Sequence, residues 1–200
     1  MTGTTHYLGG VLTGLALVAC ATPDLSSLEG IVISVAAIGV SSLGSLIPDI
    51  DHPNSTASKR FKLLNLLYKG VSSIGRIFKS DTFEHRGIMH TLIVPVVFLT
   101  AQFFVKNAVV DYLLIAGMVG YLSHIVLDAL NPTGIPVLAP FYKNKIQFLP
   151  KRVCIKTSSP AEIIVKMSLI VGIVFAAKPV ISILASGVST NVQSIAEKFV

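Results

Sequence analysis

Charged residues are scarce in this sequence, and tryptophan is absent. Asp, Glu, Lys and Arg make up 13% of its 200 residues, whereas about a quarter is usual for a soluble domain. Hydrophobic residues make up 52% of the chain, and the mean hydropathy is +0.74. This composition excludes an ordinary soluble protein and predicts an integral membrane protein that has the lipid bilayer as a partner.

Cysteine occurs only twice, as Cys20 and Cys154. Their wide separation excludes a disulfide framework and a CxxC metal clip. Cys20 ends a short apolar string that resembles a bacterial lipoprotein cleavage site. A secretory signal opens on a positive region, however, and residues 1–16 contain no Lys or Arg. We therefore expect no cleavage at Cys20, so that His6 stays in the chain.

The excess positive charge is spread over several loops. The net charge is +6 and the pI is about 9.4, but the Lys and Arg residues lie between apolar runs rather than on one basic domain. Such a distribution fits membrane topology and anionic lipid headgroups better than nucleic acid. We expect no nucleic-acid partner.

Five apolar runs divide the chain, at residues 7–22, 30–47, 91–105, 108–130 and 163–185. Because a helix needs about 20 apolar residues to cross a bilayer, they predict an all-α, polytopic membrane helix bundle with four or five spans. We expect one integral membrane domain over residues 1–200. The fifth run contains Lys166, Lys178 and Pro179, so it is one span, a kinked span or two half-helices. Small residues in the second run predict a helix-packing face: Ala36, Ala37, Gly39, Ser41, Ser42 and Gly44.

The distribution of charge among the loops predicts their orientation. Loops 51–90 and 131–160 carry most of the Lys and Arg, whereas the only charges in the linker 23–29 are Asp24 and Glu29. Because short cytoplasmic loops are rich in Lys and Arg, we expect both long loops and the N-terminus in the cytoplasm.

Residues 61–69 mix apolar residues with cations. They form either an amphipathic helix on the membrane surface or a solvated helix packed on the bundle.

All five histidines fall at the predicted cytoplasmic ends of these runs, together with several carboxylates. His6 precedes the first run, and His85 and His90 precede the third. The remaining members follow the second run or lie near the end of the fourth: Asp49, Asp51, His52, His124 and Asp128. Ionised carboxylates beside hydrocarbon are costly unless they pair or bind a metal. The topology therefore predicts a metal site at one end of the bundle.

Local spacing refines this hypothesis. His124 and Asp128 are four residues apart and share one helix face, within reach of one ion. Asp49 and Asp51 point the same way if the flanking prolines keep their segment extended. Each element alone also has a simpler interpretation: a hydrogen-bonded His–Asp couple, a helix-capping turn at residues 49–53, and ordinary interfacial histidines at 85 and 90. Their convergence at one end favours the metal site.

Four segments carry a family resemblance: residues 5–10, 46–53, 85–91 and 123–134. They resemble the signature blocks of the YdjM-like family of bacterial inner-membrane proteins, and the match covers about residues 1–150. The resemblance implies a bacterial inner-membrane location and metal-dependent hydrolysis. The order of the ligands is also similar, more remotely, to the zinc-dependent phospholipase C and P1 nuclease group. No histidine follows His124, so we expect one or two ions instead of three.

We therefore predict a metal-dependent hydrolase at the cytoplasmic membrane face, acting on a phosphoester or phospholipid. A divalent ion is expected, Zn first, with Mn or Fe as alternatives, because imidazole and carboxylate ligands suit these metals. Asp51 is the candidate base or an additional ligand, and Arg86 either holds an anionic phosphate or contacts lipid headgroups. The expected ligands are His6, Asp49, His85, His90, His124 and Asp128.

Two other classes of protein use the same residues differently. A metal or proton-coupled transporter needs polar groups along the membrane, but the interiors of the second and third runs offer little beyond serines and Gln102, and Asp111 lies near the opposite end of the fourth. A non-catalytic scaffold needs a closed metal shell that pins the helices together, whereas a hydrolase needs an open position for water.

Overall fold

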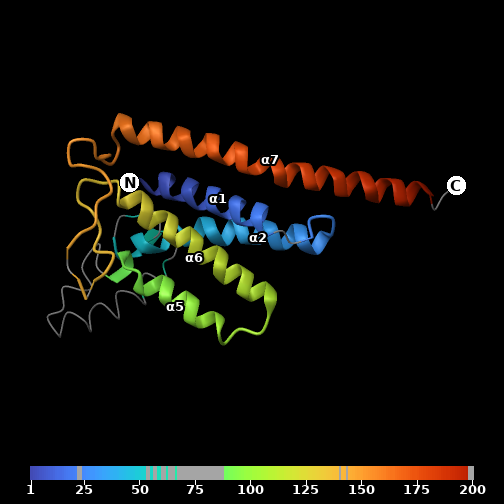
Figure 1. The fold of residues 1–200 in the computed structure, drawn as a ribbon, viewed down its shortest axis with the longest axis horizontal. Helices are drawn as coiled ribbons and strands as arrows, with labels where there is room; N and C mark the ends of the chain where they lie inside the picture. The colour runs from blue at the N-terminus through green and yellow to red at the C-terminus, as the bar shows by residue number, and fades with distance from the viewer. Residues whose placement is uncertain are drawn as a thin grey trace.

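A computed structural model describes residues 1–21, 24–52, 88–139 and 144–197, together with residues 55, 58, 59, 62, 66, 141 and 142. The described part of the chain forms five α-helices, namely α1 (Gly3–Cys20), α2 (Leu28–Gly44), α5 (Ile93–Gln102), α6 (Ala108–Asp128) and α7 (Pro160–Glu197). Two 3-10 helices, η1 (Ile47–Asp51) and η3 (Ile88–His90), join them (Figure 1). Within this part, sheet-like pairing is confined to one bridge between Ile135 and Ile146. The all-α prediction is confirmed for these residues.

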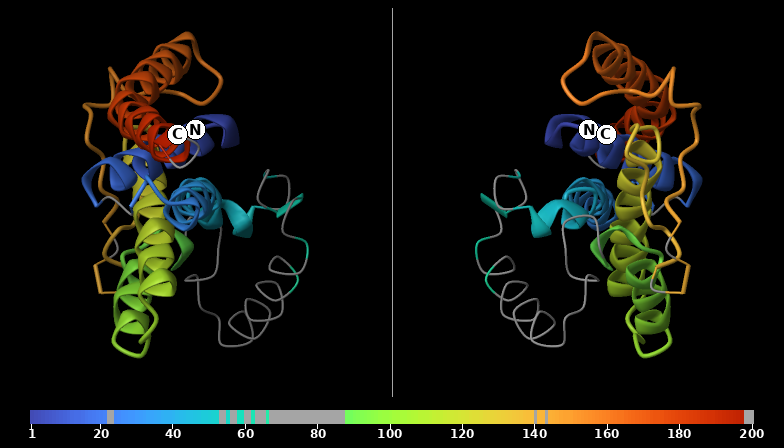
Figure 2. Two further views of the ribbon diagram at one scale, coloured as in Figure 1. Left: turned by 90° about the vertical axis from the view of Figure 1, so that its right-hand side faces the viewer. Right: turned by 90° about the vertical axis from the view of Figure 1, so that its left-hand side faces the viewer.

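Successive helices run in opposite directions. The helices α1, α2 and α6 contact one another, α7 packs on α1, and α5 packs on α6 (Figures 1 and 2). The starts of α1, α5 and α7 therefore lie at the same end as the ends of α2 and α6 (Figure 1). This end, which also holds η1 and η3, is called the site end below.

Among the described residues, two helices are long and apolar enough to cross a membrane: α6 and the part of α7 from Pro160 to Ala185. The helices α2 and α5 are apolar but shorter, with 17 and 10 residues. The first helix begins at Gly3, so His6 lies inside it and not before it. The fifth apolar run is part of one continuous helix that includes Pro179, which excludes two separate half-helices. The predicted surface segment 61–69 lies almost wholly outside the described residues.

Local side chains explain where the central helices begin. The Ser27 hydroxyl accepts a hydrogen bond from the Gly30 amide at 3.0 Å and caps α2. The Asn107 side-chain oxygen accepts from the amides of Val109 and Val110 at 3.0 and 3.1 Å and caps α6. Both contacts satisfy amides that a helix leaves without partners at its start.

Glycines bring the three central helices unusually close. A Cβ atom on Gly120 of α6 would lie 1.9 Å from the Ser41 carbonyl oxygen of α2, and one on Gly44 would lie 2.5 Å from the Gly117 carbonyl oxygen. A Cβ on Gly10 of α1 would lie 2.7 Å from the same Ser41 oxygen. No residue with a side chain fits at these positions without moving a helix backbone.

The predicted packing face of the second run is confirmed at its buried positions. Ala37, Ser41, Ser42 and Gly44 are buried and follow one side of α2. The prediction is wrong for Gly39, which is exposed and faces open space. Composition alone does not separate the two sides of α2, because small residues occur on both.

Candidate metal centre

Five of the six expected ligands lie together at the site end: His6 of α1, Asp49 of η1, His90 of η3, and His124 and Asp128 of α6. We call them the His/Asp cluster. Donor atoms of His6, Asp49 and His124 lie within 4.8 Å of one another, as do those of His90, His124 and Asp128. His124 belongs to both groups and is therefore the centre of the cluster.

The Nε2 atom of His124 faces three potential co-ligands. It lies 3.3 Å from His90 Nε2, 3.7 Å from Asp49 Oδ1 and 3.7 Å from Asp128 Oδ2. His90 Nε2 in turn lies 3.8 Å from Asp49 Oδ1 and 3.7 Å from Asp128 Oδ2. The His124–Asp128 distance is too long for a hydrogen bond. The interpretation as a simple His–Asp couple therefore does not describe this pair.

A backbone carbonyl fixes the protonation of the His124 ring. Nδ1 lies 2.7 Å from the Ser45 carbonyl oxygen. A carbonyl oxygen only accepts hydrogen bonds, so Nδ1 of the neutral ring carries the hydrogen and is the donor of this hydrogen bond. The lone pair is then on Nε2, which faces the cluster. Metal-binding histidines commonly have such a partner on the second nitrogen, because it fixes both the tautomer and the ring orientation.

His6 enters the cluster by stacking on His124. The two ring centroids are 3.7 Å apart, with planes 17° from parallel. His6 Nε2 lies 3.3 Å from Asp128 Oδ1, yet neither ring nitrogen of His6 makes a hydrogen bond of good geometry within the described part of the chain, and both are buried. Buried polar atoms in folded proteins are nearly always partnered. A ring nitrogen of His6 is therefore suited to coordinate a metal ion.

The two oxygens of Asp128 have different surroundings. Oδ1 accepts a hydrogen bond from Asn131 Nδ2 at 2.7 Å and pairs with the Met1 amino group at 2.7 Å. Oδ2 faces His90 and His124. This division holds the carboxylate in place through Oδ1, which also lies near the His6 imidazole, and presents Oδ2 to the imidazoles of His90 and His124.

The members of the cluster are buried to different degrees. His6, His90 and His124 are fully buried, and Asp128 is 2% exposed. Asp49 of η1 is 19% exposed and is the least buried member of the cluster.

One local expectation about the acidic segment is wrong. Residues 47–51 form a 3-10 helix and are not extended. Asp49 lies in the cluster. The side chain of Asp51 lies outside the described structure, as do His85 and Arg86. His52 follows η1 and belongs to neither group of donors.

Sequence reasoning missed Glu162, a buried carboxylate near the start of α7. Its Oε1 accepts hydrogen bonds from the Thr2 amide at 2.6 Å, the Thr2 hydroxyl at 2.8 Å and the Thr5 hydroxyl at 2.5 Å. Its Oε2 accepts from the Ser158 amide at 2.5 Å. Because Thr5 precedes His6, this contact joins α7 to the turn of α1 that carries a candidate ligand.

Ser45 and Asn131 were missed as well. Ser45 acts through its carbonyl oxygen, which leaves no signal in the sequence. Asn131 lies three residues after Asp128 inside a recognised block, and that position just beyond the helix end was a usable signal.

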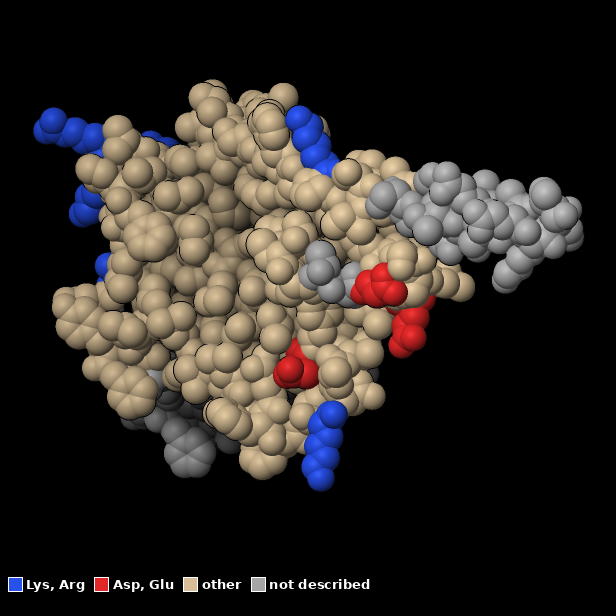
Figure 3. Space-filling view, turned by 45° about the vertical axis from the view of Figure 1, so that its right-hand side comes forward, with Lys and Arg blue, Asp and Glu red and all other residues tan. Residues whose placement is uncertain are grey.

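Charges are distributed unequally between the two ends. Exposed Lys145, Lys151, Arg152 and Lys156 lie in the connection between α6 and α7 at the site end. Asp24 and Glu29 are exposed at the opposite end, beside the start of α2. Lys106, between α5 and α6 at the opposite end, is exposed as well. In Figure 3, several Lys and Arg side chains lie at the left of the molecule and others project at the top and bottom, whereas the visible Asp and Glu lie right of centre.

Together these features define an all-helical membrane protein with a buried His/Asp cluster at one end of its bundle. Residues 1–192 match the sequence profile of the family described as YdjM inner membrane protein, and the chain belongs to this family. The predicted resemblance to the YdjM-like family is thereby confirmed, whereas these matches do not show the remote similarity to the phospholipase C and P1 nuclease group.

Two relatives illustrate the match. The chain is 34% identical over 144 residues to the uncharacterized protein YvsG of Bacillus subtilis, covering 70% of this chain and 74% of YvsG. It is 39% identical over 102 residues to the inner membrane protein YdjM of Escherichia coli, covering 49% of this chain and 46% of that protein. No solved structure matches the chain.

Proposed function

We propose that this protein is a membrane-embedded, metal-dependent hydrolase of phosphoesters, phospholipids among them. The observation that supports it is the spacing of the donors around His124 Nε2. Two ligands bound at about 2.0–2.1 Å to a tetrahedral zinc ion stand roughly 3.4 Å apart. The measured separations of 3.3 to 3.8 Å are close to this value.

His6, Asp49, His90, His124 and Asp128 would hold one or two divalent ions, with His85 as a sixth expected ligand. Zinc is the first choice, with Mn or Fe as alternatives, because the donors are nitrogen and oxygen without thiolate. Such an ion lowers the pKa of water and polarises a phosphoryl group. The two stacked rings of His6 and His124 and the bonds to Asn131 and Ser45 preorganise the donors.

The proposed reaction is hydrolysis of a phosphoester bond. The oxygen of water attacks phosphorus, the phosphorus–oxygen bond to the alcohol breaks, and the alcohol oxygen takes up a proton. Asp51 is the proposed base that accepts the proton of the water, and Arg86 the proposed contact for the phosphate. Asp49, beside the proposed base in the sequence, is the least buried of the proposed ligands.

The proposed orientation places the site end in the cytoplasm, with four or five spans across the inner membrane. The exposed cations at the site end and the acids at the other end support it.

A cysteine-labelling experiment tests this orientation. In a variant without Cys20 and Cys154, we expect Asn144→Cys to react only with a reagent that reaches the cytoplasm. Ser26→Cys, at the opposite end, should react with an impermeant reagent added to intact cells. Both residues are exposed, so access to the side chain does not bias the comparison. The reverse pattern would overturn the orientation.

Metal removal tests the reaction itself. Purified protein should hydrolyse p-nitrophenyl phosphate or its diester, lose this activity after dialysis against a chelator, and regain it with Zn or Mn. A loss of about 10²-fold or more is expected, since the ion supplies several kcal/mol of transition-state stabilisation. If chelation lowers the melting temperature and no ester is hydrolysed under any condition, the cluster is a structural site and the hydrolase proposal is wrong.

A further inference from the structure

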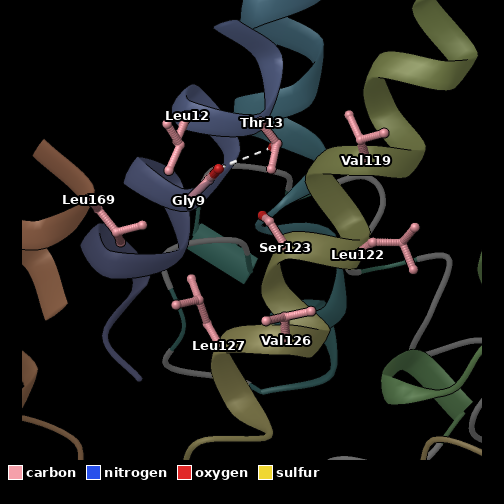
Figure 4. Close-up of a pocket in the computed structure, with 9 residues that line it drawn as sticks. All are labelled: Gly9, Leu12, Thr13, Val119, Leu122, Ser123, Val126, Leu127 and Leu169. Carbon is pink, nitrogen blue, oxygen red and sulfur yellow. Dashed lines mark hydrogen bonds between the residues drawn. The ribbon is translucent and has the colours of Figure 1, made fainter. Parts of the chain in front are cut away.

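A groove of about 390 Å³ opens between α1, α6 and α7 (Figure 4). Its wall is formed largely by aliphatic side chains: Leu12, Val119, Leu122, Val126, Leu127 and Leu169. Gly9 forms part of the wall where α1 approaches α6, and a Cβ there would lie 2.8 Å from Leu127 Cδ1. Its volume is near the lower limit for small-molecule sites, about 300 Å³, which suits one slender chain.

The two hydroxyl groups of the groove already have hydrogen-bond partners, and that of Thr13 also lies 3.1 Å from the Ser41 hydroxyl of α2. Thr13 Oγ1 donates to the carbonyl oxygens of Gly9 and Gly10, at 3.1 and 3.2 Å. Ser123 Oγ donates to the Gly120 carbonyl oxygen at 2.7 Å. The groove therefore presents an apolar surface and suits a hydrocarbon occupant better than a polar one.

The groove and the His/Asp cluster share helical turns. Gly9 follows His6 by three residues, Ser123 directly precedes His124, and Leu127 directly precedes Asp128. Three residues of helix correspond to about 4.5 Å along the axis. An amphiphile whose chain lies in the groove thus has its polar group within reach of the cluster.

The charge at the site end favours an anionic polar group. Lys145, Lys151, Arg152 and Lys156 are exposed there, and such cations attract anionic lipid headgroups. An apolar groove on the same helical turns as the His/Asp cluster, with exposed cations at the same end of the molecule, matches the layout of an anionic phospholipid.

We propose that the groove seats one acyl chain of an anionic phospholipid substrate, which enters sideways from the bilayer and brings its phosphoester to the His/Asp cluster. This inference rests on the proposed hydrolase function and names its substrate class. Binding of the acyl chain orients the phosphoester, because contacts to the non-reacting part of a substrate fix the position of its reacting group.

Photolabelling tests the seat without requiring activity. The metal-loaded protein is reconstituted in phosphatidylcholine vesicles that contain a trace of phosphatidic acid with a photoreactive group at the end of one acyl chain. After irradiation, we expect the label to concentrate on residues 9–13 and 119–127. Val126→Trp should lower this labelling about tenfold, because the larger side chain fills the groove.

Val97→Trp is the matched control. Val97 of α5 is 59% exposed and lies outside the groove, while Val126 is 50% exposed and lines it. The control should label as the parent does. Labelling spread evenly over the exposed faces of α5 and α7, or unchanged in Val126→Trp, would show ordinary bilayer lipid and overturn the groove.

Hydrolysis separates this inference from the proposed function. Long-chain phosphatidic acid should be hydrolysed at least about tenfold faster than a dibutanoyl analogue, and Val126→Trp should reduce that ratio relative to Val97→Trp. Equal rates for both substrates, with metal-dependent activity intact, would overturn the proposal that the groove binds an acyl chain. The hydrolase proposal would still stand. If no ester is hydrolysed, the hydrolase fails, and labelling concentrated in the groove still supports the lipid seat.

Discussion

Replacing His124 by alanine is expected to abolish metal binding. His124 belongs to both groups of donors and directs Nε2 at His90, Asp49 and Asp128. Its loss therefore removes a ligand from either arrangement of ions. Mass spectrometry of detergent-purified protein should find about one or two equivalents of Zn, Mn or Fe in the parent and less than about a tenth in the variant.

His52→Ala is the control for this measurement. It removes a histidine at the same end of the molecule that belongs to neither group, so its metal content should equal that of the parent. Size-exclusion chromatography and the melting temperature identify a variant that fails to fold, and Asp128→Ala gives a second test. A parent that stays metal-free after reconstitution with all three metals would mean that the histidines form a packing and ion-pair network.

Replacing Gly120 by alanine is expected to damage the fold far more than its single added methyl group suggests. The new Cβ would lie 1.9 Å from the backbone oxygen of Ser41, and a backbone atom has no rotamer to move to. The helices α2 and α6 must separate, and overpacking of this kind costs about 3 kcal/mol. We expect a clear drop in melting temperature and reduced metal content, since α6 carries His124 and Asp128.

Gly39→Ala is a control of identical chemistry on α2. A Cβ at Gly39 meets nothing within 4 Å. Alanine also favours the helix over glycine by about 1 kcal/mol, so the melting temperature should stay the same or rise. A Gly120→Ala protein as stable as the Gly39→Ala protein would show that the close approach of α2 and α6 is not needed.

The grouping of the His/Asp cluster could be predicted because a membrane bundle leaves few places for polar residues. The cluster consists of His6, Asp49, His90, His124 and Asp128. Residues at alternate ends of successive antiparallel helices fall on the same side, whatever the rotation of each helix. The structure brings these five residues together at the site end. The rotation of each helix about its own axis could not be predicted from the sequence, because it depends on the glycine contacts between α1, α2 and α6. The stacking of His6 on His124 follows from that rotation and is seen only in the structure.

Two other features could not be derived from local sequence. Pro48 and Pro53 are compatible with an extended segment, but proline also suits the first turn of a helix. Here the segment following α2 closes into η1 and turns Asp49 toward the histidines. Glu162 carries no motif and lies far from the recognised blocks, and its partners Thr2 and Thr5 are identified only by the docking of α7 on α1.

The bonds of Glu162 connect the helix that carries His6 to a segment that is synthesised after all the described ligands. Thr2, at the start of α1, makes no side-chain capping bond of its own, and Glu162 accepts from its amide instead. Glu162 follows all five described ligands in the chain, whereas His6 precedes the other four. During synthesis, chains emerge from the N-terminus. A nascent chain that has reached Asp128 therefore contains every described ligand but still lacks the carboxylate that bonds to the start of α1, the helix that carries His6.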